Sequence, residues 1–219
     1  MNPCRFLASA IASASLALLA PDAGAKPIAF ANGTTVMLEY GGGTMNEAQV
    51  FYAPKYFWSL GGGYLELETL DGQRREITYS RVNYLARRWN MKAAQANVFV
   101  WGGAGRAYVS ETNGSRVSWN AGGQIDYETR RVYGSLKTDL HRSAAFSHRI
   151  DTLQVGVAPY EHDYDTLATW LVVQGRNATG GIGEDTEWAL LLRLFKRGAW
   201  IEAGATTDGK LQAMAMVNF

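Results

Sequence analysis

The chain of 219 residues is poor in cysteine, histidine and proline, with one, three and five of them respectively. The lone cysteine, Cys4, excludes a disulfide framework within the chain. Lys and Arg form no block and the formal net charge is +1, so the electrostatic footprint of a nucleic-acid-binding protein is missing and we expect no nucleic acid partner. No linker or hinge separates two cores, which indicates one domain.

The first 25 residues have the pattern of a secretory signal peptide. Arg5 precedes an apolar run of small residues at 6–20, and the stretch at 23–25 reads Ala-Gly-Ala, a pattern that signal peptidase accepts. The run is short for a membrane helix, which needs roughly 20 apolar residues. We therefore expect residues 1–25 to be a cleaved signal peptide and residues 26–219 to form a single mature domain without a thiol.

Apolar and polar residues alternate along much of the mature chain. In residues 210–219 the odd positions are all apolar, from Leu211 to Phe219, whereas the even positions are Lys210, Gln212, Met214, Met216 and Asn218. Residues 117–128, 132–141 and 187–194 show the same split, with charged residues of both signs on the polar face. A period of two is typical of β-strands with one apolar face. A soluble β-sandwich also alternates in this way, so the pattern alone leaves both folds open.

About twelve strands can be counted, separated by turn-forming residues. The expected strands cover residues 34–41, 46–53, 57–69, 76–89, 95–109, 116–129, 132–141, 148–158, 167–176, 187–195, 199–206 and 210–219. Most of these lengths suit a tilted strand that crosses a bilayer, which takes roughly 9–11 residues. Ten strands is the first alternative, because residues 53–55 could be a kink within one strand, and eight is the second.

The end of the chain resembles the C-terminal signature of Gram-negative outer-membrane β-barrels. Phe219 is the last residue, and Val217 and three further apolar residues precede it at every second position. The resemblance implies an all-β, up-and-down, antiparallel transmembrane barrel in the outer membrane. It also implies two partners, outer-membrane lipid and the barrel assembly machinery, which would read Val217 and Phe219 as its signal. With an even number of strands, both termini face the periplasm.

Turn residues and aromatic residues fit this orientation. Segments near residues 71–72, 113–114, 141–148, 177–185 and 208–209 fall outside the cell, and turns at 129–131 and 196–198 fall in the periplasm. Tyr40, Tyr52, Trp119, Tyr127 and Trp188 fall on predicted outward faces. Several lie near strand ends, where aromatic rings favour the headgroup level of a membrane.

If the apolar faces meet lipid, the charged residues of the strands face an enclosed lumen. The expected lumen-lining residues are Glu39, Glu66, Arg81, Arg87, Asp126, Glu128, Lys137, Asp139, Glu187, Arg193 and Glu202. Buried charges must be paired or solvated, so they form either an interior network of ion pairs or a charged constriction that selects solutes. The sequence therefore favours a non-enzymatic barrel, either a narrow channel for small polar solutes or a structural or accessory envelope protein.

Two alternatives remain open at this stage. Asp139, His141 and His148 fall around one expected hairpin, where a histidine beside a carboxylate could activate water in a barrel hydrolase acting on lipid or peptide. A soluble periplasmic β-protein that carries a lipophilic ligand is the other. Glu161, His162, Asp163 and Asp165 could ligate a cation, although their spacing matches no standard loop. Met37, Met214 and Met216 could bind a cuprous ion if they face the lumen, but methionine more commonly serves as flexible filling. We expect no cofactor, and the sequence gives no oligomeric state.

Overall fold

The computed structural model describes residues 28, 30–110, 114–161 and 165–219. Its secondary structure consists of β-strands joined by turns and loops. The strands are β1 (Gly33–Gly41), β2 (Met45–Lys55), β3 (Trp58–Glu68), β4 (Arg74–Asn90), β5 (Ala94–Val109), β6 (Gly114–Thr129), β7 (Val132–Ser143), β8 (Ser147–Val157), β9 (Ala168–Ala178), β10 (Glu187–Lys196), β11 (Ala199–Thr206) and β12 (Leu211–Asn218). No helix long and apolar enough to cross a membrane occurs among the described residues.

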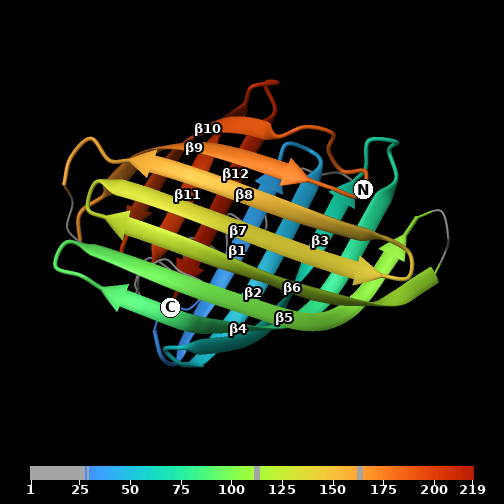
Figure 1. Cartoon of the computed structure of the whole chain (residues 1–219), viewed down its shortest axis with the longest axis horizontal. Helices are drawn as coiled ribbons and strands as arrows, with labels where there is room; N and C mark the ends of the chain where they lie inside the picture. Colours follow the sequence, from blue (N-terminus) through green and yellow to red (C-terminus); the bar gives the residue numbers. More distant parts are fainter. Residues whose placement is uncertain (1–27, 29, 111–113, 162–164) are drawn as a thin grey trace.

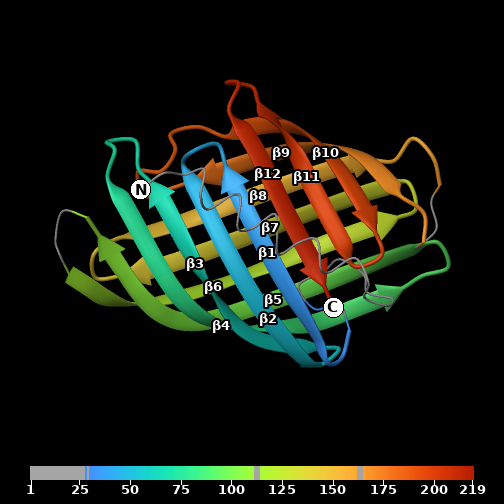
Figure 2. The same ribbon diagram turned by 180° about the vertical axis from the view of Figure 1, so that it is seen from behind.

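The twelve strands form one closed antiparallel barrel. Each strand pairs with its neighbours in sequence, and β1 closes the ring by pairing with β12. Figure 1 shows β4 to β9 across the front wall, and Figure 2 shows β1 to β3 with β10 to β12 from behind. The prediction of an up-and-down barrel of about twelve strands is confirmed, and the observed strand ends lie within two residues of the expected ones.

The first and last strands are joined by side-chain as well as backbone hydrogen bonds. The amide of Thr34 donates to the carbonyl of Phe219 at 2.6 Å, and the amide of Phe219 donates to the carbonyl of Thr34 at 3.0 Å. Inside the barrel, the hydroxyl of Thr35 donates to Oδ1 of Asn218 at 2.5 Å. Closure removes the free sheet edges that an open sheet would present.

The barrel has two ends, which differ in the segments that connect the strands there. We call the end where β1 begins and β12 finishes the terminal mouth, and the opposite end the loop mouth. At the terminal mouth, Lys55 of β2 pairs with Trp58 of β3 across a short turn. There β2 continues through Pro54 to Lys55, and its pairing with β3 shifts between Tyr52 and Lys55. Residues 53–55 lie at the end of β2, where the pairing is irregular, and β3 follows after a turn, so the alternative of ten strands is wrong.

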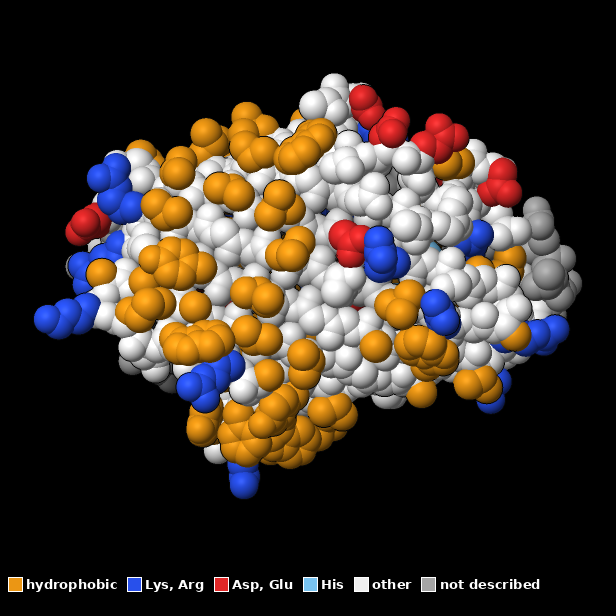
Figure 3. Space-filling model, viewed as in Figure 1, with side chains coloured by type: hydrophobic (Ala, Val, Ile, Leu, Met, Phe, Trp, Pro, Cys, Tyr) orange, Lys and Arg blue, Asp and Glu red, His pale blue; other side chains and the backbone are white. Residues whose placement is uncertain are grey.

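The outer wall is rich in apolar side chains at the alternate positions of nearly every strand. Exposed examples are Leu38, Val50, Leu60, Val82, Val100, Ile125, Leu136, Val155, Leu171, Leu190, Leu192, Ile201 and Leu211. The rings of Tyr40, Tyr52, Trp119, Tyr127 and Trp188 are exposed as well. Figure 3 shows hydrophobic side chains gathered over the left and centre of one face, with charged side chains mostly toward its edges and its right part.

In the middle of the barrel, the side chains of the inner wall are mostly polar, whereas the core of a soluble protein is mostly apolar. Buried polar side chains there include Gln49, Arg81, Asn83, Asn97, Asn120, Asp126, Asp139, Gln174, Arg176, Arg193, Glu202 and Gln212. Buried apolar side chains collect instead in three clusters nearer the two mouths. The barrel therefore has a polar centre between apolar ends.

Candidate functional site

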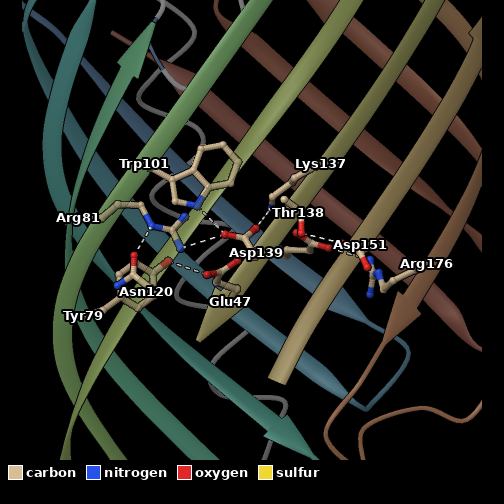
Figure 4. A network of polar contacts seen from close by, with 11 residues as sticks. Glu47, Tyr79, Arg81, Trp101, Asn120, Lys137, Thr138, Asp139, Asp151 and Arg176 are labelled. Atoms are coloured by element: carbon tan, nitrogen blue, oxygen red, sulfur yellow. Dashed lines mark hydrogen bonds and ion pairs between the residues drawn. The ribbon is translucent and has the colours of Figure 1, made fainter. Parts of the chain in front are cut away.

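Asp139 of β7 is the centre of a polar network that connects three parts of the barrel wall (Figure 4). Its carboxylate accepts hydrogen bonds from Nη2 of Arg81 at 3.2 Å and from the indole N–H of Trp101 at 2.7 Å. The ammonium of Lys137 lies 3.0 Å from the other carboxylate oxygen. Because two cations and one neutral donor share it, this carboxylate is fully paired in an environment where an unpaired ion would be very costly.

The alternation of the strands brings these groups together. Arg81 occupies an inward position of β4, Trp101 of β5, and Lys137 and Asp139 of β7. Between them β6 contributes Gly122, where an added Cβ would lie 2.5 Å from Nε1 of Trp101. The missing side chain at this position leaves space for the indole to reach Asp139.

A second group surrounds Arg193 of β10. Its guanidinium lies between two aromatic rings, 4.2 Å from the centroid of Tyr133 and 4.1 Å from that of Trp200, a distance suited to cation–π attraction. Its Nη2 donates to Gln154 at 2.8 Å and to Glu202 at 3.2 Å. Tyr133 belongs to β7 and Trp200 to β11, so this stack joins strands that are not neighbours.

The third group joins β9 to the strands around the closure. Nη2 of Arg176 donates to Glu39 of β1 at 2.7 Å. Gln174 donates to Gln212 of β12 at 2.7 Å, and Gln212 in turn donates to Glu187 of β10. Arg176 and Gln174 are inward neighbours on β9, so one strand holds two lines of contact across the lumen.

These groups enclose a cavity of about 150 Å³ in the centre of the barrel. Charged side chains that line it are Glu39, Arg81, Asp126, Glu128, Lys137, Arg176 and Glu202. Met37, Met214, Met216 and the rings of Phe51, Phe99, Trp101, Tyr133 and Trp200 complete much of its wall. A chamber of this size could hold a few water molecules or one small solute.

The loop mouth is covered by residues 179–186, which connect β9 to β10 and which we call the lid loop. The carbonyl of Gly181 accepts a hydrogen bond from the amide of Leu70 at 2.8 Å, and the carbonyl of Gly180 accepts one from Nη1 of Arg75 at 2.7 Å. Leu70 and Arg75 lie at the β3–β4 hairpin, five strands away around the ring in either direction. The lid loop therefore reaches from one side of the mouth to the other.

The hairpin that receives the lid loop is held by its own hydrogen bonds. The hydroxyl of Thr69 donates to the carboxylate of Asp71, and the amide of Thr69 donates to the carbonyl of Gln73 at 3.0 Å. The bond from Thr69 lowers the pKa of Asp71 below its ordinary value, with help from the backbone at Gln73. Asp71 therefore stays ionised at mildly acidic pH.

Beneath the lid loop lies an apolar cluster that we call the mouth cluster. Its members are Met45, Leu65, Leu67, Ile77, Tyr79, Ala107, Ile150 and Ile182. Ile182 comes from the lid loop itself and is buried, and Ile150 comes from β8, on the far side of the barrel from β2 and β3. Apolar side chains from opposite walls therefore meet across the lumen here.

The terminal mouth is blocked in part by a residue that precedes the first strand. The side chain of Ile28 is fully buried and packs with Ala53, Leu85, Phe99 and Trp101. All four of these partners occupy inward positions of β2, β4 and β5. Both ends of the chamber are thus narrowed by residues that do not belong to strands.

Most of the charged residues expected to line the lumen point inward. Nine of them either line the cavity or bind another side chain inside the barrel: Glu39, Arg81, Asp126, Glu128, Lys137, Asp139, Glu187, Arg193 and Glu202. Glu66 and Arg87 lie on the outer wall instead. Leu65 and Leu67 are buried in the mouth cluster, so Glu66 between them faces out, where Arg74 lies 2.6 Å away.

Arg87 faces out because of an irregularity in β4. The pairing of β4 with β5 shifts between Leu85 and Arg87, which leaves one extra residue in β4 and reverses the alternation beyond it. Arg87 then lies over the exposed ring of Trp89, and the inward position passes to Arg88. Nε of Arg88 donates to Asn97 at 2.7 Å, and Asn97 donates to Asp126 at 2.6 Å.

His141 and His148 lie in strands and inside the barrel, whereas the sequence placed the segment at 141–148 outside the cell. β7 and β8 extend to Ser143 and from Ser147, which makes the two histidines direct cross-strand partners. Their rings stack with centroids 5.0 Å apart and are 2% and 1% exposed. Nδ1 of His141 and both ring nitrogens of His148 have no hydrogen-bond partner.

The possible metal ligands are not gathered by the structure. His162 and Asp163 lie outside the described residues, Glu161 is exposed, and Asp165 forms an exposed ion pair with Arg197 at 3.3 Å. Within the described parts of the chain, no group of three or more His, Cys, Asp or Glu side chains could hold a metal ion. Met37 and Met216 are cross-strand partners, and with Met214 they line the chamber.

Several residues of the interior gave no separate signal in the sequence. Glu47 accepts a hydrogen bond from Tyr79 at 2.5 Å, and Arg88 donates to its cross-strand partner Asn97. Trp101 and Arg176 donate to carboxylates on strands that are not their neighbours. Alternation could have placed Glu47 and Arg176 inward, since both lie in expected strands. Which residue meets which depends on the register of distant strands, and the sequence does not show that register.

The chain is thus a closed, twelve-stranded antiparallel β-barrel with a polar interior. No family model matches it, and no curated protein does. Among solved structures, a chain from "Unveiling the Mechanism Behind the in-meso Crystallization of Membrane Proteins" is similar, with a TM-score of 0.39 and 10% identity. The match covers 85% of this chain and 82% of that chain. A likeness of this strength carries no argument about function.

Proposed function

We propose that this chain is a Gram-negative outer-membrane protein, a narrow channel for small polar solutes that is shut in the conformation described above. Residues 1–25 act as a cleaved signal peptide, and residues 26–219 form the mature barrel. Three observations support the membrane location: the closed ring of strands, the apolar outer wall and the polar lumen. A bilayer requires closure because every backbone polar group must be satisfied inside the protein.

The direction of the side chains disfavours the soluble carrier. A carrier of a lipophilic ligand would turn its apolar faces inward and its charges out. Here Leu190 and Leu192 are about half exposed on the outer wall, and the neighbouring Arg193 is 3% exposed within the lumen. The chamber between the mouths holds ion pairs, which suit water or a polar solute.

The arrangement around Asp139 also disfavours a hydrolase. One of its oxygens accepts from Arg81 and Trp101, and the other faces Lys137. A carboxylate occupied in this way does not orient His141 as a general base, which needs a hydrogen bond from the imidazole. Asp139, His141 and His148 are better explained as parts of the interior network and of the mouth closure.

The observation that carries the channel is that a loop, and not the strands themselves, closes the mouth above a charged chamber. A structural barrel can be filled by side chains of its own strands, but here a loop spans the loop mouth. Beneath it lies a cavity of about 150 Å³ lined by charges of both signs. Apolar constrictions such as the mouth cluster can shut a pore by excluding water.

Planar bilayer recordings test this function at neutral pH. The wild type should conduct rarely, and Ile182→Asp should conduct in frequent steps because a carboxylate cannot remain in the mouth cluster. Thr186→Asp is the matched control, since it adds the same charge at an exposed position of the lid loop. If Ile182→Asp folds and stays silent, the barrel is a structural or accessory protein. Recovery of the wild type in a soluble fraction without detergent would refute the membrane location.

A further inference from the structure

We infer that His141 and His148 form a proton-sensitive latch, so that mild acid releases the lid loop and opens the loop mouth. The inference rests on the proposed function for its role in conduction, but the movement of the lid loop can be measured without it. Three sets of contacts support it: those between the lid loop and His148, those between the histidines, and those of the nearby charges.

The lid loop lies directly against β8, at Ser147 and His148. At Gly180, where φ is +76°, an added Cβ would lie 2.3 Å from the carbonyl oxygen of Ser147 and 3.0 Å from Cβ of His148. The loop is tied to the same strand by Thr179, whose amide donates to the carbonyl of Arg149 at 2.9 Å. A change in the position of His148 is therefore transmitted directly to the lid loop.

The two imidazoles are suited to this position only while they are neutral. They stack nearly parallel, with 13° between the ring planes, and Phe146 stacks on His148 at 5.9 Å. Three of their ring nitrogens are buried and have no hydrogen-bond partner. A proton on either ring would create a buried cation with an unsatisfied N–H, which is costly.

The charges that face the pair do not provide a free counter-ion. Arg75 of β4 lies over Phe146 at 4.9 Å and binds the lid loop, and Arg81 of β4 and Lys137 of β7 flank the pair from below. The nearby carboxylates are Asp139, Glu39 and Glu47, which line one small cavity with His141. Asp139 already binds Arg81, Lys137 and Trp101, and Glu39 already binds Arg176. Tyr79, whose ring contacts His141, donates to Glu47. Each nearby carboxylate thus already has a partner, and a protonated imidazole would be a further buried cation beside Arg75, Arg81 and Lys137.

Opening of the lid loop would relieve this cost by letting water reach both rings. Imidazoles in water take up protons between about pH 5 and 7. The open state then binds up to two more protons than the closed state, so the ratio of open to closed molecules rises as the pH falls. Linkage gives a rise of up to about tenfold per pH unit for each histidine. Asp71 stays ionised over this range, so the hairpin that holds the lid loop keeps its own bonds.

Thiol labelling measures the opening directly. Ala107 is fully buried in the mouth cluster, so Ala107→Cys reports access beneath the lid loop, with Cys4→Ser in every variant to leave one thiol. Ala144→Cys, at an exposed position next to β7, corrects for the effect of pH on thiol reactivity. Ala168→Cys is buried near the terminal mouth and should stay unlabelled unless the whole barrel loosens.

The corrected labelling rate at Ala107→Cys should rise about tenfold or more between pH 7.5 and 5.5. In His141→Phe/His148→Phe, which keeps two stacked rings but cannot be protonated, the rate should stay low at both values. A flat rate in the parent, or an equal rise in the double variant, would overturn the inference. If Ala107→Cys does not fold, Met45→Cys in the same cluster replaces it.

The labelling result and the bilayer result separate the two proposals. Labelling that rises in acid while Ile182→Asp remains silent would support the latch and remove the channel. Conduction by Ile182→Asp with labelling that does not depend on pH would support the channel and remove the latch.

Discussion

Replacement of Asp139 should destabilise the barrel more than replacement of any exposed acid. Asp139→Ala leaves Arg81, at 4% exposure, without its carboxylate and leaves the indole N–H of Trp101 without its acceptor. Removal of one partner from a buried ion pair costs about 3–5 kcal/mol. Part of this cost is relieved here because the side chain of Lys137 is 28% exposed to the cavity. We therefore expect a loss of about 3 kcal/mol.

Asp151→Ala is the matched control on the same hairpin. Asp151 pairs with Arg149 at 2.8 Å, but the side chains are 32% and 55% exposed, so the loss should be about 0–1 kcal/mol. Urea unfolding of the refolded barrel in lipid vesicles, followed by tryptophan fluorescence, gives both values on one scale. Equal losses for the two variants would refute the view that the interior network stabilises the fold.

Two further changes test the outer wall and the fit of Trp101. Leu190→Arg places a charge on the apolar outer wall and should cost about 2–4 kcal/mol for insertion into vesicles, whereas Thr186→Arg in the lid loop should cost little; similar values would argue against contact with lipid. Gly122→Ala should displace Trp101 from Asp139 and cost about 1–3 kcal/mol, visible as a shifted emission maximum and a lower urea midpoint; an unchanged spectrum would show that the indole is not confined there.

The strands were predictable because their signal is local. Alternation from Leu211 to Phe219 identifies the last strand, and turn residues mark the ends of the others. The same rule predicted which charges face inward, and nine of those eleven side chains make contacts inside the barrel or line its cavity. Glu66 and Arg87 escaped it for two different reasons: the polarity of the wall reverses beside the mouth cluster, and an extra residue in β4 shifts the pattern by one.

The closures were not predictable, because they depend on contacts between distant parts of the chain. Ile182 stands in a stretch of Gly, Glu and Asp that reads as an ordinary loop. Its role appears only when β3 and β4 are placed opposite β9 and β10 by ring closure. The expected strands already ended at His141 and began at His148, but the burial of both rings depends on their direct pairing and on the lid loop that lies against His148.

The position of Ile28 would give the proposed cleavage after Ala25 a direct effect on the finished barrel. This residue stands three positions after the expected cleavage point, and its side chain occupies the inside of the terminal mouth. A protease that removed a few more residues from this N-terminus would remove the side chain of Ile28 from the terminal mouth and leave every strand intact. Mass spectrometry of the purified protein should therefore accompany the planar bilayer recordings, because molecules with and without Ile28 would form two populations of barrels.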